Sequence, residues 1–465
     1  MTRSSLGFLM RAADLLNRQV PRLDDHELRR FVRSILDRRN TFLSVVEKEG
    51  SPLYVTDTET LKRRARQFRE AFLAVLPDIR VYYALKSNSH PAITTTLVRE
   101  GLGLDVSSGL ELNVALSCGA RDIVFSGPGK RIDELKLAVD NAAHVTVLID
   151  SLGELRKLEQ IANQSRTSVR AGVRLTTHES GIWKKFGIRL DRLSDFFDEA
   201  RKYGRVDLCG LQFHISWNLN AESQVVFIAR LGAELRRLAR KHLERIRFID
   251  VGGGFWPEDG EWLQPAATPL GMLRTALADT EISGRDHYRR PACSISDFAH
   301  HISAALRNQL PEDFNGTICL EPGRWLCNDA MHILLTVADV KSADVVITDG
   351  GTNAVGWERF ETDYFPVINL SRPGLHEHEC LVAGSLCTPH DLWGYSYFGE
   401  SIHEGDVLVV PNQGAYTYSL RQEFIKPLPK CVKLPHTQET LQTIKSSTDL
   451  GNERREARED RYSSN

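Results

Sequence analysis

The alternation of strand-like and helix-like segments limits the fold of this chain more than any other feature. It runs from about residue 57 to residue 320, and such an order is typical of parallel strands joined by crossover helices. The expected strands are Arg80–Leu85, Leu102–Val106, Ile123–Ser126, His144–Ile149, Val169–Leu175, Leu208–Ile215, Ile246–Val251 and Gly316–Leu320. Eight strands with intervening helices predict a (β/α)₈ barrel, whose active site lies at the carboxyl ends of the strands. A doubly wound open sheet is the alternative, but the fingerprint G-x-G-x-x-G is absent from the sequence.

Beyond the barrel, which we place at residues 57–324, the sequence pattern changes. Residues 325–432 lose helical periodicity, and short apolar runs alternate with Gly, Asn and Pro turns, which predicts an all-β domain. Residues 1–56 are expected to form an N-terminal helix and a strand, Leu53-Tyr54-Val55, that partly joins the β-domain. The polar residues 433–465 predict a disordered tail.

Composition limits the classes of partner. The 465 residues exceed one ordinary core, and 42% hydrophobic with 26% charged residues indicate a globular protein. A net charge of -2 gives no electrostatic reason to expect nucleic acid or an anionic membrane as a partner. The eight cysteines form no CxxC pair, and no apolar run approaches the roughly 20 residues that a bilayer requires. We therefore expect a cytoplasmic protein with reduced thiols.

Chemically distinctive residues recur where the expected barrel strands end. Lys86 follows the first strand, Asp105 ends the second, His214 lies in the sixth, Gly252 follows the seventh and Glu321 follows the eighth. An ammonium beside a buried strand is costly, so such a lysine is usually paired or covalently used, although many lysines at strand ends are simply solvated. Their shared position predicts one site at the mouth of the barrel.

Two turns in this set indicate binding sites for an anion and for a heterocyclic ring. Gly252, Gly253 and Gly254 let backbone N–H groups approach a phosphate closely, although a flexible turn would use the same residues. The turn from Glu321 to Arg324 places a carboxylate beside a guanidinium. One interpretation is a surface ion pair. In the other, the carboxylate keeps a ring nitrogen protonated, and the arginine binds a substrate carboxylate or a phosphate.

An ordered set of motifs resembles the ornithine/diaminopimelate decarboxylase family, which are fold-type III enzymes that use pyridoxal 5′-phosphate (PLP). The similarity covers residues from about 50 to 425. Its motifs are Tyr83-Ala84-Leu85-Lys86, Lys185-Phe186-Gly187, His214, the three glycines, Glu321-Pro322-Gly323-Arg324, Cys387 with Asp391, and Gly414-Ala415-Tyr416.

The resemblance assigns roles to residues of the barrel. It implies that Lys86 forms the Schiff base with PLP, that Asp105 supports the lysine side of the ring and that His214 lies against the ring face. Gly252 to Gly254 and the Gly323 amide would bind the phosphate. Glu321 would keep the pyridine nitrogen protonated, with Arg324 beside it as the residue for phosphate or substrate.

The resemblance also assigns roles to three residues of the β-domain. Tyr416 would reach the cofactor and the substrate. Cys387 would come from the second subunit of a homodimer with shared active sites, beside Asp391, to protonate the carbanion and contact the substrate. A thiol suits this role because its pKa can be tuned across neutral pH.

The implied activity is that of a carboxy-lyase, which releases carbon dioxide from an amino acid and forms an amine. A racemase on the same fold is the enzymatic alternative, but it typically pairs the ring nitrogen with an arginine, so Glu321 favours decarboxylation. A non-catalytic PLP-carrying regulator is the other alternative, disfavoured because a carrier needs neither a β-domain nor Cys387.

Three stretches depart from the family pattern. Trp217 stands where the family usually has a phosphate-binding serine, so Ser216 or Asn218 would have to substitute. Thr388, not an acidic residue, follows Cys387, which argues against diaminopimelate and ornithine. The pattern is closer to the siderophore and antibiotic branch of secondary metabolism, whose substrates are modified or carrier-linked amino acids. The long connection 256–301 is interpreted as a lid or a specificity insert.

One run of the sequence contains residue types that bind metal ions. The run His376-Glu377-His378-Glu379-Cys380 places possible ligands at alternate positions of a strand. No second ligand pair of suitable spacing accompanies it, so we expect no metal site.

Overall fold

The computed structural model describes residues 3–17, 19–278, 286–356, 360–435 and 443–444. The chain divides into two compact units. The barrel unit comprises Thr58–Glu258 and Cys293–Asn328, and the β-unit comprises Met1–Asp57, Asp259–Ala292 and Asp329–Asn465.

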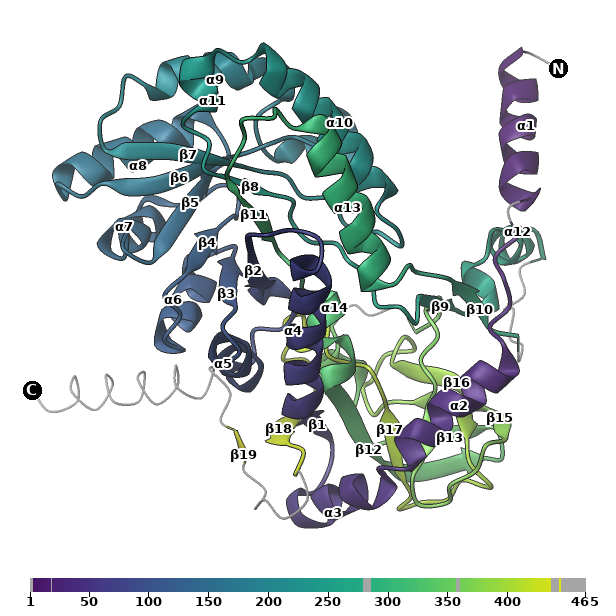
Figure 1. Cartoon of the computed structure of the whole chain (residues 1–465). Coiled ribbons are helices and arrows are strands. Elements are labelled where there is room, and N and C mark those ends of the chain that lie inside the picture. Colours follow the sequence, from purple (N-terminus) through teal and green to yellow (C-terminus); the bar gives the residue numbers. More distant parts are fainter. Residues whose placement is uncertain (1–2, 18, 279–285, 357–359, 436–442, 445–465) are drawn as a thin grey trace, which may run out of the picture. The chain divides into compact units, whose positions relative to one another are not determined.

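In the described part of the barrel unit, eight parallel strands close a barrel in the order β11-β2-β3-β4-β5-β6-β7-β8 (Figure 1). The strands are β2 (Ile79–Ala84), β3 (Gly103–Val106), β4 (Ile123–Phe125), β5 (Val145–Ile149), β6 (Val169–Arg174), β7 (Val206–Gln212), β8 (Phe248–Asp250) and β11 (Thr317–Leu320). Every strand lies inside or within two residues of an expected one. The predicted (β/α)₈ barrel is therefore confirmed.

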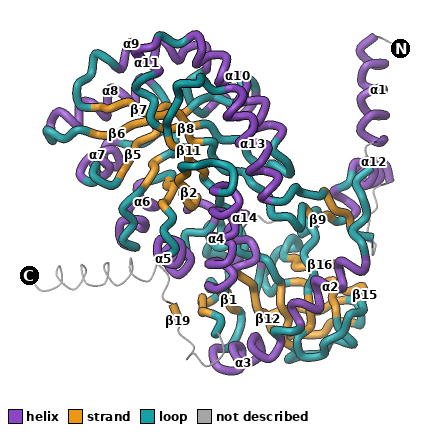
Figure 2. Tube along the Cα trace, viewed as in Figure 1, coloured by secondary structure: helices purple, strands orange, loops and turns teal. Residues whose placement is uncertain are grey.

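Helices surround this barrel, as the tube in Figure 2 shows. They are α4 (Thr58–Leu73), α5 (Pro91–Arg99), α6 (Gly109–Ser117), α7 (Ile132–Asp140), α8 (Leu152–Gln164), α9 (Leu193–Ala200), α10 (Glu222–Arg237), α11 (Arg240–Leu243), α13 (Ile295–Gln309) and α14 (Arg324–Cys327). Local sequence sets several of their ends. The side chains of Ser108 and Ser151 accept hydrogen bonds from the first turns of α6 and α8, as capping serines do. Gly101 and Gly119 follow α5 and α6 with positive φ, which lets the chain turn into the next strand.

Phe248 of β8 fills the interior of the barrel beside Tyr82, Leu148 and other apolar side chains. It has room because neighbouring strands carry glycine. A Cβ at Gly210 would lie 2.1 Å from the Phe248 ring, and a Cβ at Gly172 would lie 2.9 Å from it. The interior is thus a packed core, and the site belongs at the rim where the strands end.

In the described part of the β-unit, nine strands form one sheet in the order β13-β15-β16-β14-β17-β12-β1-β18-β19. They are β1 (Leu53–Thr56), β12 (Met331–Ser342), β13 (Val345–Thr348), β14 (Ile368–Asn369), β15 (Glu377–Ala383), β16 (Leu392–Phe398), β17 (Val407–Val410), β18 (Lys430–Lys433) and β19 (Thr443–Ile444). Strand β1, from the N-terminal segment, lies antiparallel to β12 and parallel to β18.

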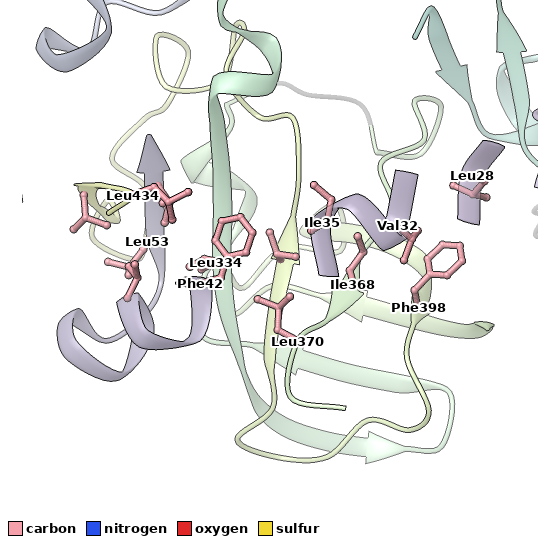
Figure 3. Close-up of a cluster of buried hydrophobic side chains, with 14 of the residues drawn as sticks. Leu28, Val32, Ile35, Phe42, Leu53, Leu334, Ile368, Leu370, Phe398 and Leu434 are labelled. Atoms are coloured by element: carbon pink, nitrogen blue, oxygen red, sulfur yellow. The ribbon is translucent and has the colours of Figure 1, made fainter. Parts of the chain in front are cut away.

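Helices α1 (Arg3–Asn17), α2 (Asp25–Leu36) and α3 (Arg39–Glu49) precede the sheet in the chain. Leu28, Val32 and Ile35 of α2 and Phe42 of α3 are buried in an apolar cluster with side chains from the sheet (Figure 3). The N-terminal segment therefore contributes to the hydrophobic core of the β-unit.

The long connection from the barrel also belongs largely to the β-unit. Its residues 259–292 include the strand pair β9 (Glu261–Leu263) and β10 (Tyr288–Arg290) and the helix α12 (Pro269–Ala278). Trp262 packs against the apolar cluster, and Tyr364 donates a backbone hydrogen bond to the Trp262 carbonyl at 3.0 Å. The segment is thus part of a packed core, and a role as a lid stays a prediction.

The expected tail falls mostly outside the described residues. Within it, Lys433 ends strand β18, Leu434 donates a backbone hydrogen bond to Thr56 at 2.8 Å, and β19 pairs with β18. Ordered pairing therefore reaches beyond residue 432. None of the helices in the described ranges combines the length and the apolar content needed to cross a membrane.

Candidate active site

Lys86 lies at the rim of the barrel, in a single helical turn (Leu85–Ser87) that follows β2. Its Nζ donates to Oδ2 of Asp105 over 2.9 Å, and the Asp105 side chain is fully buried while Lys86 is about one-third exposed. The other Asp105 oxygen accepts a hydrogen bond from Ser126, and the Ser126 carbonyl accepts one from Arg174 at 2.7 Å. Lys86 is thereby held beside a buried carboxylate, and the role of Asp105 toward a cofactor ring stays a prediction.

His214 follows β7 and is held by both ring nitrogens. Its Nδ1 accepts a hydrogen bond from the Gly253 amide at 3.0 Å, and its Nε2 lies 3.1 Å from the Ser216 hydroxyl. Burial, with Lys86 and Arg174 nearby, lowers the pKa of His214 to about 3. The imidazole is therefore neutral, with Nε2 as the protonated nitrogen.

Glu321 follows β11 and is almost fully buried. The Gln212 amide donates to both of its carboxylate oxygens, at 3.3 and 3.2 Å, and His214 Nδ1 lies 3.7 Å from Oε2. The Glu321 amide donates to the Gly252 carbonyl at 2.8 Å, which joins the turn after β11 to the glycine loop after β8. A buried carboxylate of this kind can stabilise a cationic group placed beside it.

The three glycines are required by close packing. A Cβ would lie 2.4 Å from the Phe213 carbonyl oxygen at Gly252, 2.2 Å from the Glu321 carbonyl oxygen at Gly253 and 2.0 Å from the Ile215 carbonyl oxygen at Gly254. Gly252 and Gly254 also have φ of +73° and +83°. No other side chain fits these positions without movement of the backbone.

Some backbone amides near this loop donate hydrogen bonds within the protein, and others do not. The Gly252 amide donates to Asp250, and the Gly253 amide donates to His214. Within the described part of the chain, the amides of Gly254 and Gly323 make no hydrogen bond. These two amides are available for an anion such as a phosphate.

Arg324 begins α14, directly after the Glu321 turn. Its guanidinium lies over the Trp256 ring, 4.6 Å from the centroid, and Nη1 is 3.4 Å from Asn328 Oδ1. Trp217 has φ of +56° and is 71% exposed, an unusual backbone conformation for a bulky residue. Asn218 is buried and donates to the Ile215 carbonyl at 2.8 Å, so its side chain holds the loop.

Cys387, Asp391 and Tyr416 belong to the β-unit. Cys387 is an exposed free thiol. Both oxygens of the buried Asp391 are used within the β-unit. Oδ1 accepts from the Thr352 amide at 2.6 Å and from its hydroxyl at 3.0 Å, and Oδ2 accepts from the Leu386 amide at 2.6 Å. Asp391 thus holds the loop that carries Cys387, and a direct contact of Asp391 with the substrate stays a prediction.

The barrel rim contains functional residues that sequence reasoning missed. Ser126, Arg174, Gln212 and Asp250 all lie at the carboxyl end of a barrel strand, beside a predicted site residue. In the sequence, a single polar residue in a strand cannot be distinguished from a polar residue without a function. Testing every polar residue at those ends would have found all four, because the barrel brings them to one rim.

Among the residues that the structure describes, no group of three or more His, Cys, Asp or Glu side chains could hold a metal ion. Glu377 of the His376–Cys380 run is bonded to His287, Tyr364 and Ser396. All three hydrogen bonds go to Oε1 of Glu377, so this oxygen has a structural use.

The donor set of the barrel rim fits PLP. Lys86 offers an amine for the aldehyde, Glu321 a buried carboxylate for the ring nitrogen, and Gly254 and Gly323 free amides for the phosphate. His214 is a neutral ring near both Lys86 and Glu321. These groups come from separate barrel strands, which together place them at one rim.

The chain is similar to known proteins over most of its length. Residues 58–328, more than half of the chain, match the family described as "Pyridoxal-dependent decarboxylase, pyridoxal binding domain". The chain is 28% identical over 397 residues to a diaminopimelate decarboxylase of Methanothermobacter thermautotrophicus, which covers 82% of this chain and 86% of that protein. It is 26% identical over 404 residues to an L-glutamyl-[BtrI acyl-carrier protein] decarboxylase of Niallia circulans, with 81% and 86% covered.

A solved structure shares the fold. The crystal structure of a diaminopimelate decarboxylase from M. jannaschii superposes with a TM-score of 0.73 at 23% identity, covering 87% of this chain and 91% of that one. The predicted combination of a (β/α)₈ barrel with an all-β domain is confirmed. The chain belongs to the pyridoxal-dependent decarboxylase family, and it is a PLP-dependent enzyme that decarboxylates an amino acid or an amino-acid conjugate.

Proposed function

We propose that the substrate is an α-amino acid whose side chain is joined to a larger acid or to a carrier, and not one that ends in a free amine. The observation that carries this proposal is the use of Asp391. A free distal ammonium needs an unengaged carboxylate near the proton donor. Thr388 follows Cys387, and Asp391, the carboxylate of this loop, is buried with both oxygens already accepting hydrogen bonds.

The relative from Niallia circulans supports the same class, because its name specifies a glutamyl group on an acyl-carrier protein. The diaminopimelate decarboxylases support the general reaction, which is loss of carbon dioxide from a carbon that bears an amine. The combination favours decarboxylation of a linked amino acid.

PLP, when bound, supplies an electron-withdrawing ring that accepts the electron pair left when carbon dioxide departs. We assign the residues as follows. Lys86 holds the aldehyde carbon and is itself held by Asp105. Glu321 keeps the ring nitrogen protonated, because a buried carboxylate favours a cation beside it.

The remaining assignments concern the ring face, the phosphate and proton return. Neutral His214 packs against the ring face without adding a charge. The free amides of Gly254 and Gly323 bind the phosphate, with Arg324 directing the phosphate or a substrate carboxylate. Cys387 returns a proton to the substrate carbon, for which an exposed thiol is suited.

We propose a homodimer in which the Cys387 of one subunit serves the Lys86 of the other. Two inactive variants, Lys86→Ala and Cys387→Ala, test this arrangement when they are unfolded and refolded together. Half of the dimers would be mixed, and each would hold one intact site of two, so about a quarter of wild-type activity should return. Activity that stays at the level of the separate variants would show that the two residues serve sites within one subunit.

The substrate proposal is tested by carbon dioxide release from a matched panel. The panel contains meso-diaminopimelate, L-ornithine and L-lysine with free distal amines, and L-glutamate both free and as a thioester on an acyl-carrier protein. We expect kcat/KM for the linked compound to exceed that for each diamino acid by about 100-fold, which corresponds to about 2.7 kcal/mol. A diamino acid that is turned over faster than the linked compound would contradict the proposal.

Glu361 provides an internal control for that panel. Its carboxylate is partly exposed and lies 3.7 Å from Nδ1 of His390, which comes three residues after Cys387 in the chain. If Glu361 receives a distal ammonium, Glu361→Gln will lower the rate with diamino acids alone. We expect Glu361→Gln to change no ratio between substrates in the panel.

A further inference from the structure

Asp250 is a buried carboxylic group at the end of β8 that no step above uses. It is fully buried, and the β-ladder places it between Gln212 of β7 and Cys319 of β11. Its Oδ1 accepts a hydrogen bond from the Gly252 amide at 2.8 Å. Within the described residues, its Oδ2 has no hydrogen-bond partner.

A second carboxylate lies on the same side of the sheet as Asp250. Gln212, the ladder partner of Asp250 on β7, donates to both oxygens of Glu321, and Glu321 comes two residues after Cys319, the ladder partner of Asp250 on β11. Two ionised carboxylates would both accept and neither would donate, so Oδ2 would be buried unpaired. A proton on Oδ2 turns this oxygen into a donor and removes both the repulsion and the unpaired atom.

Electrostatics favours the proton on Asp250. Burial, followed by the charge of Glu321, raises the pKa of Asp250 well above its usual range, while the Gly252 amide opposes the rise. The charge of Asp105 also raises the pKa of Asp250. The Cys319 thiol, which is the ladder neighbour of Asp250, has its own pKa raised by burial and by Asp250.

We propose that Asp250 is a positioning residue that stays a neutral carboxylic acid and donates its proton in a hydrogen bond to Glu321, so that this buried pair carries one negative charge. This single charge matches the single positive charge of a protonated pyridine nitrogen. If both carboxylates were ionised, the pair would contain a buried anion without a partner. If both were protonated, the ring nitrogen would lack its anion. The pairing of this negative charge with the pyridine nitrogen rests on the proposed function, whereas the protonation of Asp250 does not.

Three variants separate this role from others. Asp250→Asn keeps an acceptor for the Gly252 amide and an N–H donor for Glu321, so it copies the neutral acid at every pH. Asp250→Leu has similar volume and removes both. Asp122→Asn is the matched control, because it removes a half-exposed carboxylate paired with Arg80 at 3.4 Å in the same unit.

The direct test is infrared difference spectroscopy of the apoenzyme at neutral pH. Subtracting the Asp250→Asn spectrum from that of the wild type should show the carbonyl stretch of a neutral carboxylic acid, and the Asp122→Asn difference should show carboxylate bands alone. A carboxylate signature in the Asp250→Asn difference would overturn the proposal. The substrate panel tests the proposed function independently, since its failure would leave this spectrum unchanged.

Two further measurements do not depend on turnover. Asp250→Leu should weaken PLP binding about tenfold or more, whereas Asp250→Asn should stay within about threefold of the wild type. The proton on Asp250 also predicts a pH effect, because a raised folded-state pKa makes stability fall as pH rises. The ratio of the unfolding constants of wild type and Asp250→Asn apoenzyme should change by about tenfold per pH unit from about pH 5 up to the raised folded-state pKa of Asp250. Equal loss of PLP binding in Asp250→Asn and Asp250→Leu, or a ratio independent of pH, would overturn the proposal.

Discussion

The loop that carries Cys387 should depend on Asp391 for its conformation. Asp391→Ala removes an acceptor that receives three hydrogen bonds, two from Thr352 and one from the Leu386 amide. Because Asp391 is buried, the two backbone amides cannot simply turn to water when their acceptor is lost. We therefore expect a structural effect first and a catalytic effect through Cys387.

The magnitude follows from the charge and burial of the acceptor. Hydrogen bonds to a charged group contribute about 1.5–3 kcal/mol each, and three bonds to one carboxylate do not add fully. A loss of about 3 kcal/mol is a conservative value for the whole set. For a unit of this size, each kcal/mol lowers the melting temperature by about 2–4 °C, so the expected fall is about 6–12 °C.

The assay is thermal unfolding of the PLP-loaded enzyme, read beside kcat and KM. Asp339→Ala is the matched control, because Asp339 lies in the same unit and its carboxylate forms an exposed ion pair with Lys341 at 3.0 Å. Its loss should change stability by at most about 0.5 kcal/mol. If Asp391→Ala melts with the wild type while its KM rises sharply, Asp391 binds substrate and the loop-holding role is wrong.

Two other predictions concern residues beside the cofactor site. Cys387→Ala should bind PLP as the wild type does, while kcat falls by about 100-fold or more, which is the usual contribution of a positioned proton donor. Cys118→Ala is the control, and an unchanged kcat in Cys387→Ala would remove Cys387 from the mechanism. His214, with a pKa lowered to about 3 from 6.5, takes up its proton mainly on unfolding, so it lowers stability as pH falls from 6.5 towards 3. His214→Gln should remove up to about 1.4 kcal/mol of that loss per pH unit in urea unfolding of the apoenzyme, and exposed His300→Gln should not; parallel curves for wild type and His214→Gln would contradict a neutral imidazole.

Much of the barrel could be predicted because its signals are local. Apolar runs such as Val145–Ile149 are buried along their whole length, and capping residues such as Ser151 mark the helix that follows. The barrel then brings the ends of all strands to one rim, so Lys86 and Glu321 could be placed in one site from their positions alone. Pattern and topology agree in this part of the chain.

The remaining features depend on contacts between distant residues. Nothing in the sequence near Asp391 shows that Thr352 and Leu386 occupy both of its oxygens. The meeting of Asp250 and Glu321 requires the actual packing of β8 against β11. For the same reason, the connection 259–292 could not be assigned to the β-unit before its packing was seen.

The most direct test of the account is to identify which lysine carries the cofactor. Borohydride reduction of the PLP-loaded enzyme, followed by peptide mass spectrometry, makes the link to that side chain permanent. The account predicts one pyridoxyl group per chain, on the peptide that contains Lys86, and none on that peptide in Lys86→Ala. A pyridoxyl group found on another lysine, or wild-type visible absorption retained by Lys86→Ala, would contradict it.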